Sequence, residues 1–137
     1  MGIIEKSNLD RQIKQLKEQQ KRIVFTNGCF DLLHKGHIDL LNKASTFGDI
    51  LIVGLNSDNS VKTLKGKDRP IENERRRSKK LLEISNVDYV IIFNSETPRD
   101  LIMKIMPDVL VKGGDYNKND IVGSREVIST GGKVKIV

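Results

Sequence analysis

Five short apolar runs alternate along this chain with segments of helical pattern, and this alternation is what most constrains the fold. The runs lie at residues 23–25, 50–55, 89–93, 109–111 and 133–137. The second run carries no polar side chain, which is typical of a strand buried on both faces of a parallel sheet. Strands that alternate with helices favour right-handed crossovers with helices on both faces. We therefore expect an α/β fold with a doubly wound, mostly parallel sheet of five strands.

The segments between the runs predict helices and one long loop. Residues 56–73 have little periodicity and contain Gly66 and Pro70, so we expect a loop there that could act as a lid. A chain of 137 residues fits one domain, and we predict a single domain over 1–137 with an N-terminal helical segment at 1–21. The helices are expected at 9–21, from Gly36 to Phe47, at 74–85, after Thr97-Pro98, and at 121–129.

The composition is that of a soluble globular protein, with 37% hydrophobic and 31% charged residues. The longest apolar run, 50–55, is far shorter than the roughly 20 residues that span a bilayer. The first residues lack the apolar region of a signal peptide. The single cysteine, Cys29, cannot form an internal disulfide, which agrees with a reducing compartment. We expect a cytoplasmic protein without a membrane partner.

The net charge of +6 allows nucleic acid, an anionic membrane surface or small polyanions as partners. Basic residues are spread along the chain, with one dense cluster from Arg75 to Lys80, and no aromatic residues are interleaved with them as in a single-strand binder. This distribution favours small phosphorylated substrates over nucleic acid. A non-catalytic nucleotide- or RNA-binding module remains the competing interpretation.

The most informative motif follows the first apolar run, where a glycine turn leads into His34-Lys35-Gly36-His37. The helix expected from Gly36 directs its first amides and the positive end of its dipole at this turn, which favours phosphate. Two imidazoles at the same place predict a phosphate site made by His34 and His37. Zinc held by Cys29, Asp31 and the histidines is the alternative, but the spacing is not that of a zinc site and we predict no metal ligands.

Further candidates follow the carboxyl ends of other expected strands, where open parallel sheets bind ligands. Lys65 and Lys67 flank Gly66 in the expected lid, where they could close over a triphosphate. Arg77 precedes Leu81 by one helical turn, so we expect it to face nearer the core than Arg76 and to contact phosphate. Other candidates for the same crevice are Asn56-Ser57-Asp58, Asn94 to Thr97, and Lys112-Gly113-Gly114-Asp115-Tyr116, whose paired glycines allow close approach to a nucleoside.

Residues 25–37 resemble the signature of the cytidylyltransferase-like nucleotidyltransferases, whose His-x-Gly-His motif also occurs in class I aminoacyl-tRNA synthetases. Over nearly the whole chain the similarity is to the adenylyltransferases of bacterial ADP-heptose synthesis. Glycerol-3-phosphate cytidylyltransferases are similar at the first motif only, and a polyol-phosphate cytidylyltransferase is the alternative. The segments that carry the narrower resemblance are Asn56-Ser57-Asp58, Leu64-Lys65-Gly66 with Arg69-Pro70, 87–90 and 107–116.

The resemblance implies a Rossmann-like sheet of the HxGH nucleotidyltransferase type. It also implies that ATP and D-glycero-β-D-manno-heptose 1-phosphate give ADP-heptose and pyrophosphate with Mg²⁺, for lipopolysaccharide or a related surface glycan. By similarity the catalytic residues are His34, His37, Lys65 and Arg77. Nucleotide-binding residues are Thr26, Asn27, Gly28, Phe30, Gly36, Lys112, Gly113, Asp115 and Tyr116, and substrate-binding residues are Asp31, Asn56 and Asp58.

Two further expectations come from the resemblance. Similar enzymes are commonly dimers, and a separate heptose kinase is expected upstream because this chain carries no kinase domain. Family members usually continue past the last strand into a Ser/Thr-rich turn and a helix that contacts the triphosphate, whereas this sequence ends at Val137. A truncated C-terminal end, or a flexible tail beyond Val137, would explain this difference, whereas a true end at Val137 would leave this part of the site incomplete.

Overall fold

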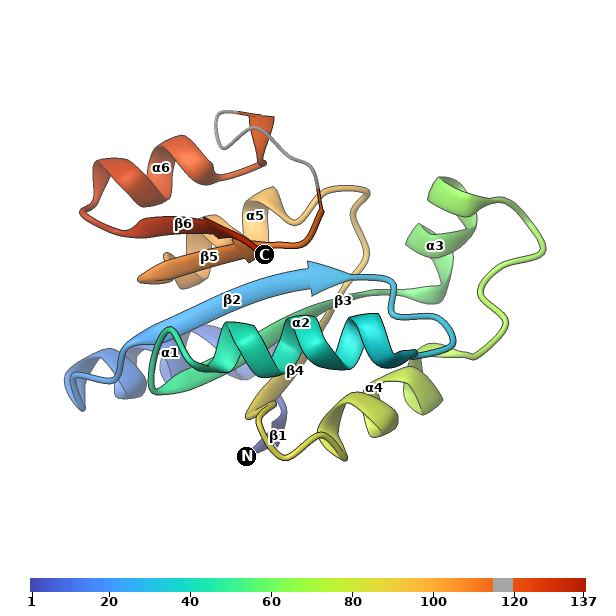
Figure 1. Cartoon of the computed structure of the whole chain (residues 1–137), viewed down its shortest axis with the longest axis horizontal. Coiled ribbons are helices and arrows are strands. Elements are labelled where there is room, and N and C mark those ends of the chain that lie inside the picture. The colour runs from blue at the N-terminus through green and yellow to red at the C-terminus, as the bar shows by residue number, and fades with distance from the viewer. Residues whose placement is uncertain (115–119) are drawn as a thin grey trace.

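One parallel sheet organises the computed structural model, which describes residues 1–114 and 120–137. In the described part of the chain the strand order is β1-β4-β3-β2-β5-β6, and every neighbouring pair is parallel (Figure 1). This confirms the predicted α/β sheet. The strands are β1 (Gly2–Ile3), β2 (Ile23–Gly28), β3 (Ile50–Asn56), β4 (Tyr89–Phe93), β5 (Val109–Lys112) and β6 (Lys133–Ile136).

The sixth strand, β1, was not predicted. It has two residues, and its backbone pairs with Tyr89 and Val90 of β4. A two-residue strand has no sequence periodicity of its own, so only pairing with β4 defines it. The predicted N-terminal helical segment therefore begins with a strand.

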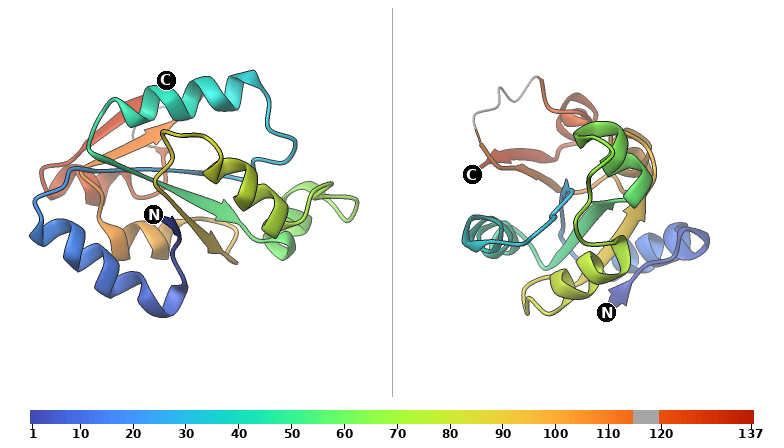
Figure 2. Two further views of the ribbon diagram at one scale, coloured as in Figure 1. Left: turned by 90° about the horizontal axis from the view of Figure 1, so that it is seen from below. Right: turned by 90° about the vertical axis from the view of Figure 1, so that its right-hand side faces the viewer.

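Helices cover both faces of the sheet, and their apolar faces follow the alternation along β2. Helices α1, α5 and α6 cover one face of the sheet, and α2 and α4 cover the other (Figures 1 and 2). Ile23 and Phe25 belong to the core cluster of the first face, whereas Val24 belongs to that of the second. The helical elements are a 3₁₀ turn at Lys6–Asn8, α1 (Leu9–Glu18), α2 (Lys35–Ser45), α3 (Asp58–Lys65), α4 (Glu74–Leu82), α5 (Arg99–Ile105) and α6 (Ser124–Ser129).

The segment expected as one long loop, 56–73, contains helix α3. The Ser57 side chain accepts a hydrogen bond from the Ser60 N–H and so caps this helix, and Gly66, at φ 109°, ends it. The prediction gave weight to Gly66 and Pro70 but missed the N-cap serine. The loop that remains is 66–73.

The order in which successive strands are added to the sheet reverses at β2. The chain runs from β2 through β3 to β4 on one side and later fills β5 and β6 on the other, so the carboxyl ends of β2 and β5 flank the switch point at which open α/β sheets bind ligands. Among the described residues, no helix has the length and apolar character needed to cross a bilayer.

Candidate functional site

The crevice forms because β2 and β5 separate near their carboxyl ends. The ladder between them includes Phe25 and Leu110, whereas β2 stays paired with β3 as far as Gly28. Beyond that ladder the buried Thr26 hydroxyl donates a hydrogen bond to the Val111 carbonyl over 2.9 Å. Thr26 therefore ties the two strands together at the base of the opening.

A tight turn carries the chain from β2 to α2. Phe30 and Leu32 adopt left-handed φ angles of 46° and 57°. The Phe30 ring packs edge-on against His37, with ring centroids 5.4 Å apart. A Cβ atom at Gly28 would lie 3.0 Å from this ring, so Gly28 allows the close packing that holds Phe30 in place. Phe30 is buried in the core beneath α2 and α4, and its ring also contacts the catalytic candidate His37.

His34 and His37 close the start of α2 as a reciprocal cap. His34 Nδ1 accepts a hydrogen bond from the Gly36 N–H over 3.0 Å, and His37 Nδ1 accepts one from the His34 N–H over 3.3 Å. A ring nitrogen that accepts is unprotonated, so in each neutral imidazole the proton lies on Nε2. Both Nε2–H groups are therefore donors on the side of the ring away from the helix backbone.

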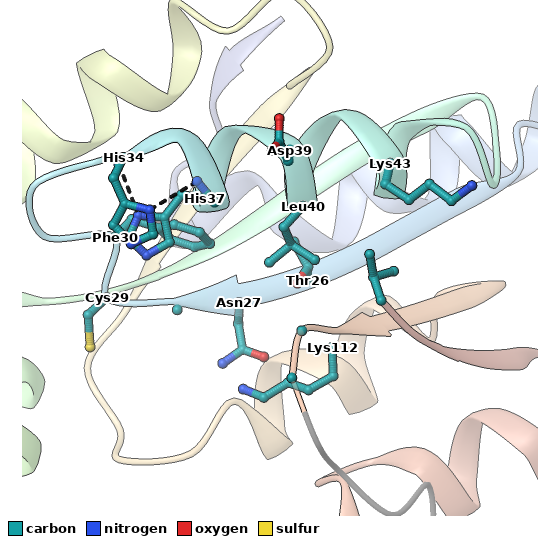
Figure 3. Close-up of a pocket in the computed structure, with 15 residues that line it drawn as sticks. Thr26, Asn27, Cys29, Phe30, His34, His37, Asp39, Leu40, Lys43 and Lys112 are labelled. Atoms are coloured by element: carbon teal, nitrogen blue, oxygen red, sulfur yellow. Dashed lines mark hydrogen bonds between the residues drawn. The ribbon is translucent and has the colours of Figure 1, made fainter.

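The two rings stack, with centroids 3.8 Å apart and 23° between their planes (Figure 3). Burial, followed by the charges of His34 and Lys65, lowers the pKa of His37. The neutral donor form of His37 is thus favoured near pH 7. A Cβ atom at Gly36 would meet His34 Cε1 at 2.9 Å, which explains the glycine between the histidines.

Two pockets meet at this histidine pair. The β5-side pocket, of about 620 Å³, extends between α2 and the end of β5, where Leu40, Lys43 and Gly113 line it. The α3-side pocket, of about 810 Å³, extends toward Lys65 at the end of α3 and toward the turn after β4. Since they share a wall, they are two lobes of one cleft. The residues that line both are Asn27, Gly28, Cys29, Phe30, His34, His37 and Lys112.

Cationic side chains concentrate in the α3-side pocket. Lys65, Arg69 and Lys112 all line it, and the Lys65 charge also lowers the pKa of His37. Lys67, the other candidate of the expected lid, lines neither pocket of the cleft. The cleft therefore combines cationic side chains with two imidazole N–H donors, which suits a polyphosphate.

Asp31 was predicted to bind substrate, and the structure shows it holding the 66–73 loop. Its carboxylate accepts hydrogen bonds from Arg69 Nε (2.8 Å) and from the N–H groups of Ile71 (2.8 Å) and Glu72 (3.0 Å). Burial alone would raise the pKa of Asp31, but these three hydrogen bonds and the Arg69 charge lower it. Asp31 also lines the α3-side pocket, so one carboxylate forms part of the cleft wall and anchors the loop above it.

Arg77 was predicted to contact phosphate, but it is fully buried and lines neither pocket of the cleft. The spacing to Leu81 was interpreted correctly, because Arg77 does face inward. What it meets there is backbone and one carboxylate. Its guanidinium donates to the carbonyls of Glu72 (2.9 Å), Cys29 (2.8 Å) and Asn56 (2.8 Å), and to Asp58 Oδ1 (2.7 Å).

The remaining predicted residues divide between the cleft and its surroundings. Asn56 is buried and lines the α3-side pocket, whereas Asp58 lines neither pocket and pairs with Arg77. Asp115 and Tyr116 lie outside the described residues. In the described part of the chain no group of three His, Cys, Asp or Glu side chains could hold a metal ion.

Some cleft residues were not predicted as site residues. Cys29 was interpreted as a packing residue, yet it lines both pockets. Burial raises the pKa of its thiol despite the nearby Lys65 and Arg77, so the thiolate is disfavoured. Arg69 and Glu96 lie within segments that the sequence singled out, and Lys43 lies six residues after His37 on α2. Local spacing alone did not assign them a role.

Known proteins resemble this chain over nearly its whole length. The cytidylyltransferase-like family matches residues 25–136. The "Bifunctional protein HldE" of Pasteurella multocida (strain Pm70) is 48% identical over 136 residues, which are 99% of this chain and 29% of that protein. The protein of the same name from Koribacter versatilis (strain Ellin345) is 52% identical over 98% of this chain and 28% of its own length. The chain thus spans less than a third of these relatives.

Solved structures share the fold. The lipopolysaccharide core biosynthesis protein from Thermoplasma volcanium GSS1 superposes with a TM-score of 0.69 and 28% identity, covering 85% of this chain and 94% of that one. Pantothenate synthetase from Thermus thermophilus superposes with a TM-score of 0.61 over the whole of this chain and 60% of its own. At 16% identity, the second likeness concerns the fold alone.

Proposed function

The chain belongs to the cytidylyltransferase-like family, and on this basis we propose that it transfers the adenylyl group of ATP to a sugar 1-phosphate and releases pyrophosphate. We propose D-glycero-β-D-manno-heptose 1-phosphate as the acceptor and ADP-heptose, a precursor of lipopolysaccharide or a related surface glycan, as the product. The similarity to HldE proteins over nearly the whole chain supports this acceptor. So does the likeness to a lipopolysaccharide core biosynthesis protein.

The observation that carries the proposal is the position of two Nε2–H donors where the two pockets meet. ATP would occupy the β5-side pocket, and the sugar phosphate would occupy the α3-side pocket. An oxygen of the sugar phosphate then attacks the α-phosphorus, and the bond from that phosphorus to the bridging oxygen of the β-phosphate breaks. His34 and His37 donate to oxygens that gain charge in this step, and their fixed geometry avoids reorganisation as the charge develops.

The lysines of the cleft have a separate part in the proposed reaction. Lys65 and Lys112 line the lobe that would hold the acceptor phosphate, so they offset repulsion between it and the triphosphate. No protein nucleophile is needed, because the acceptor oxygen attacks directly. This agrees with the raised pKa of Cys29, which keeps the cleft's thiol protonated.

Nucleotidyltransferases of this kind generally use a divalent metal ion with the nucleotide. The described residues offer no cluster of three metal-ligating side chains, and the Asp31 carboxylate already holds the 66–73 loop. Mg²⁺ commonly keeps most of its ligands as water and substrate phosphate oxygens, so we propose that it enters with ATP and neutralises phosphate charge. A homodimer and a kinase activity that makes the sugar 1-phosphate complete the proposal.

Pyrophosphate release tests this function. ATP and CTP are each combined with the heptose 1-phosphate or with glycerol 3-phosphate in the presence of Mg²⁺, and reactions without acceptor serve as blanks. We expect release only with ATP and the heptose phosphate. Release with CTP and glycerol 3-phosphate would instead support the cytidylyltransferase alternative. Binding to RNA that weakens steeply with salt, without any turnover, would support the non-catalytic module.

A further inference from the structure

Among the described residues, the α3-side pocket contains a carboxylate that the protein does not use for its own structure. The acidic side chains that line this pocket in the described part of the chain are Asp31 and Glu96. Both Asp31 oxygens accept hydrogen bonds from the 66–73 loop. Within 1–114 and 120–137, no hydrogen bond or ion pair joins the Glu96 carboxylate to another residue. Glu96 is therefore available to a ligand in the cleft.

The turn that carries Glu96 is braced on both sides. Asn94 Oδ1 accepts a hydrogen bond from the Ser57 hydroxyl over 2.5 Å. The Ser95 hydroxyl donates to the Thr97 carbonyl over 2.7 Å, and the buried Pro98 starts α5. The backbone on either side of Glu96 is thus fixed before any ligand binds, which reduces the ordering cost of a contact made there.

Charge distinguishes which part of a ligand could lie beside Glu96. A carboxylate repels a phosphate dianion, and Lys65, Arg69 and Lys112 already supply the cations of this pocket. An ionised carboxylate is an acceptor only, with two oxygens and about four lone-pair sites, so it matches groups that donate. Neighbouring hydroxyls of a sugar are such donors, and they carry no charge that Lys65 or Arg69 would repel.

We propose that Glu96 recognises hydroxyl groups of the acceptor, and that the α3-side pocket thereby selects a polyhydroxylated phosphate over a phosphate without neighbouring hydroxyls. The inference rests on the proposed function and specifies the substrate class of the same cleft. Glu96 contacts the acceptor away from the reacting phosphate, so it determines specificity and takes no part in proton transfer.

The test compares the wild type with Glu96→Gln, which keeps the shape of the side chain but replaces one acceptor oxygen with a donor. Steady-state pyrophosphate release gives KM for the heptose 1-phosphate and for ATP separately. We expect kcat/KM for the acceptor to fall about 10- to 100-fold, as for a lost hydrogen bond to a charged group, with KM for ATP unchanged. Glu83→Gln is the matched control, because Glu83 is exposed directly after the C-terminal end of α4 and lines neither pocket of the cleft.

A deoxy sugar 1-phosphate that lacks neighbouring hydroxyls provides a second comparison. The wild type should prefer the fully hydroxylated acceptor, and Glu96→Gln should lose most of that preference. Equal preference in both proteins would overturn the inference. So would a higher Mg²⁺ requirement in Glu96→Gln with an unchanged acceptor KM, since the carboxylate would then act on the metal.

The two hypotheses fail in different ways. If the wild type releases pyrophosphate and Glu96→Gln matches it in every constant, the function stands and the role of Glu96 is wrong. If the wild type releases none with any sugar phosphate, the proposed function is wrong, and calorimetric binding of the heptose 1-phosphate then decides the role of Glu96. Equal Kd values for wild type and variant in that titration would exclude a role of Glu96 in binding the acceptor.

Discussion

Arg77 of α4 donates a hydrogen bond from Nη1 to the Cys29 carbonyl oxygen over 2.8 Å, and through it a helix outside the cleft holds the turn that forms the cleft. The same nitrogen donates to the Asn56 carbonyl at the end of β3, also over 2.8 Å. Nε donates to the Glu72 carbonyl in the 66–73 loop. One buried cation therefore joins the turn after β2, the end of β3 and the loop.

Replacing Arg77 by Met should destabilise the whole domain. The change leaves the three carbonyls without this donor in a buried setting and removes the partner of Asp58. We expect a loss of about 3–5 kcal/mol in the free energy of unfolding, as for breaking a buried ion pair. Urea unfolding measures it.

Arg75→Met is the matched control, because Arg75 is exposed on the same helix. Its effect should stay within about 0.5 kcal/mol. Arg77→Lys should recover little stability, because one ammonium cannot reproduce the planar fork that reaches four acceptors. If Arg77→Met folds with full stability but loses affinity for ATP, Arg77 contacts phosphate directly, as the sequence first predicted.

Arg77 also shows how far the sequence could predict this site. Spacing to Leu81 placed the side chain inward, but its partners come from a turn, a strand end and a loop that no local pattern brings together. Strand β3 was predictable because a strand buried on both faces is apolar along its length, whereas the two-residue β1 was not predictable. Helix α3 was not predicted because the sequence marks its start with only one N-cap residue, Ser57. The histidine pair was predictable because its positions in the sequence are also neighbours on one helical turn.

His34 has two separable roles, which suitable substitutions can distinguish. It caps α2 through Nδ1, and it offers Nε2–H to the cleft. Asn is also a good N-cap, so His34→Asn should keep stability while kcat falls about 10²- to 10³-fold through the lost donor. His34→Ala should show the same kinetic loss and an additional loss of about 1 kcal/mol in stability. Pyrophosphate release and urea unfolding measure the two effects, and a full kcat in His34→Asn would exclude the catalytic role.

Asp31→Asn should loosen the 66–73 loop while preserving the fold. The neutral amide keeps one acceptor oxygen, but the ion pair with Arg69 and one of the backbone contacts are lost. Hydrogen bonds to a charged group contribute about 1.5–3 kcal/mol each, so faster amide exchange at Ile71 and Glu72 is expected. Mass-spectrometric hydrogen exchange measures it. Asp68→Asn, an exposed change in the same loop, should leave exchange as in the wild type.

The lowered pKa of His37 predicts a pH dependence of stability with a definite sign. In the unfolded chain His37 takes up a proton near the ordinary histidine value of about 6.5, whereas the folded protein holds it neutral to a lower pH. Because the unfolded state then binds more protons, the stabilisation is complete above about pH 6.5 and is lost as the pH falls below it. Protonating Nδ1 would also remove the acceptor for the His34 N–H.

Urea unfolding from pH 7.5 down to 5.5 tests this sign. We expect the free energy of unfolding of the wild type to decline over this interval and that of His37→Gln, which cannot titrate, to decline less. The lowered pKa of Asp31 acts in a different window, since its stabilisation is present above the ordinary Asp range and is lost only as the pH falls through it. Parallel pH profiles for wild type and His37→Gln would show that His37 does not titrate differently in the folded protein, and the neutral-donor role would then have to be abandoned.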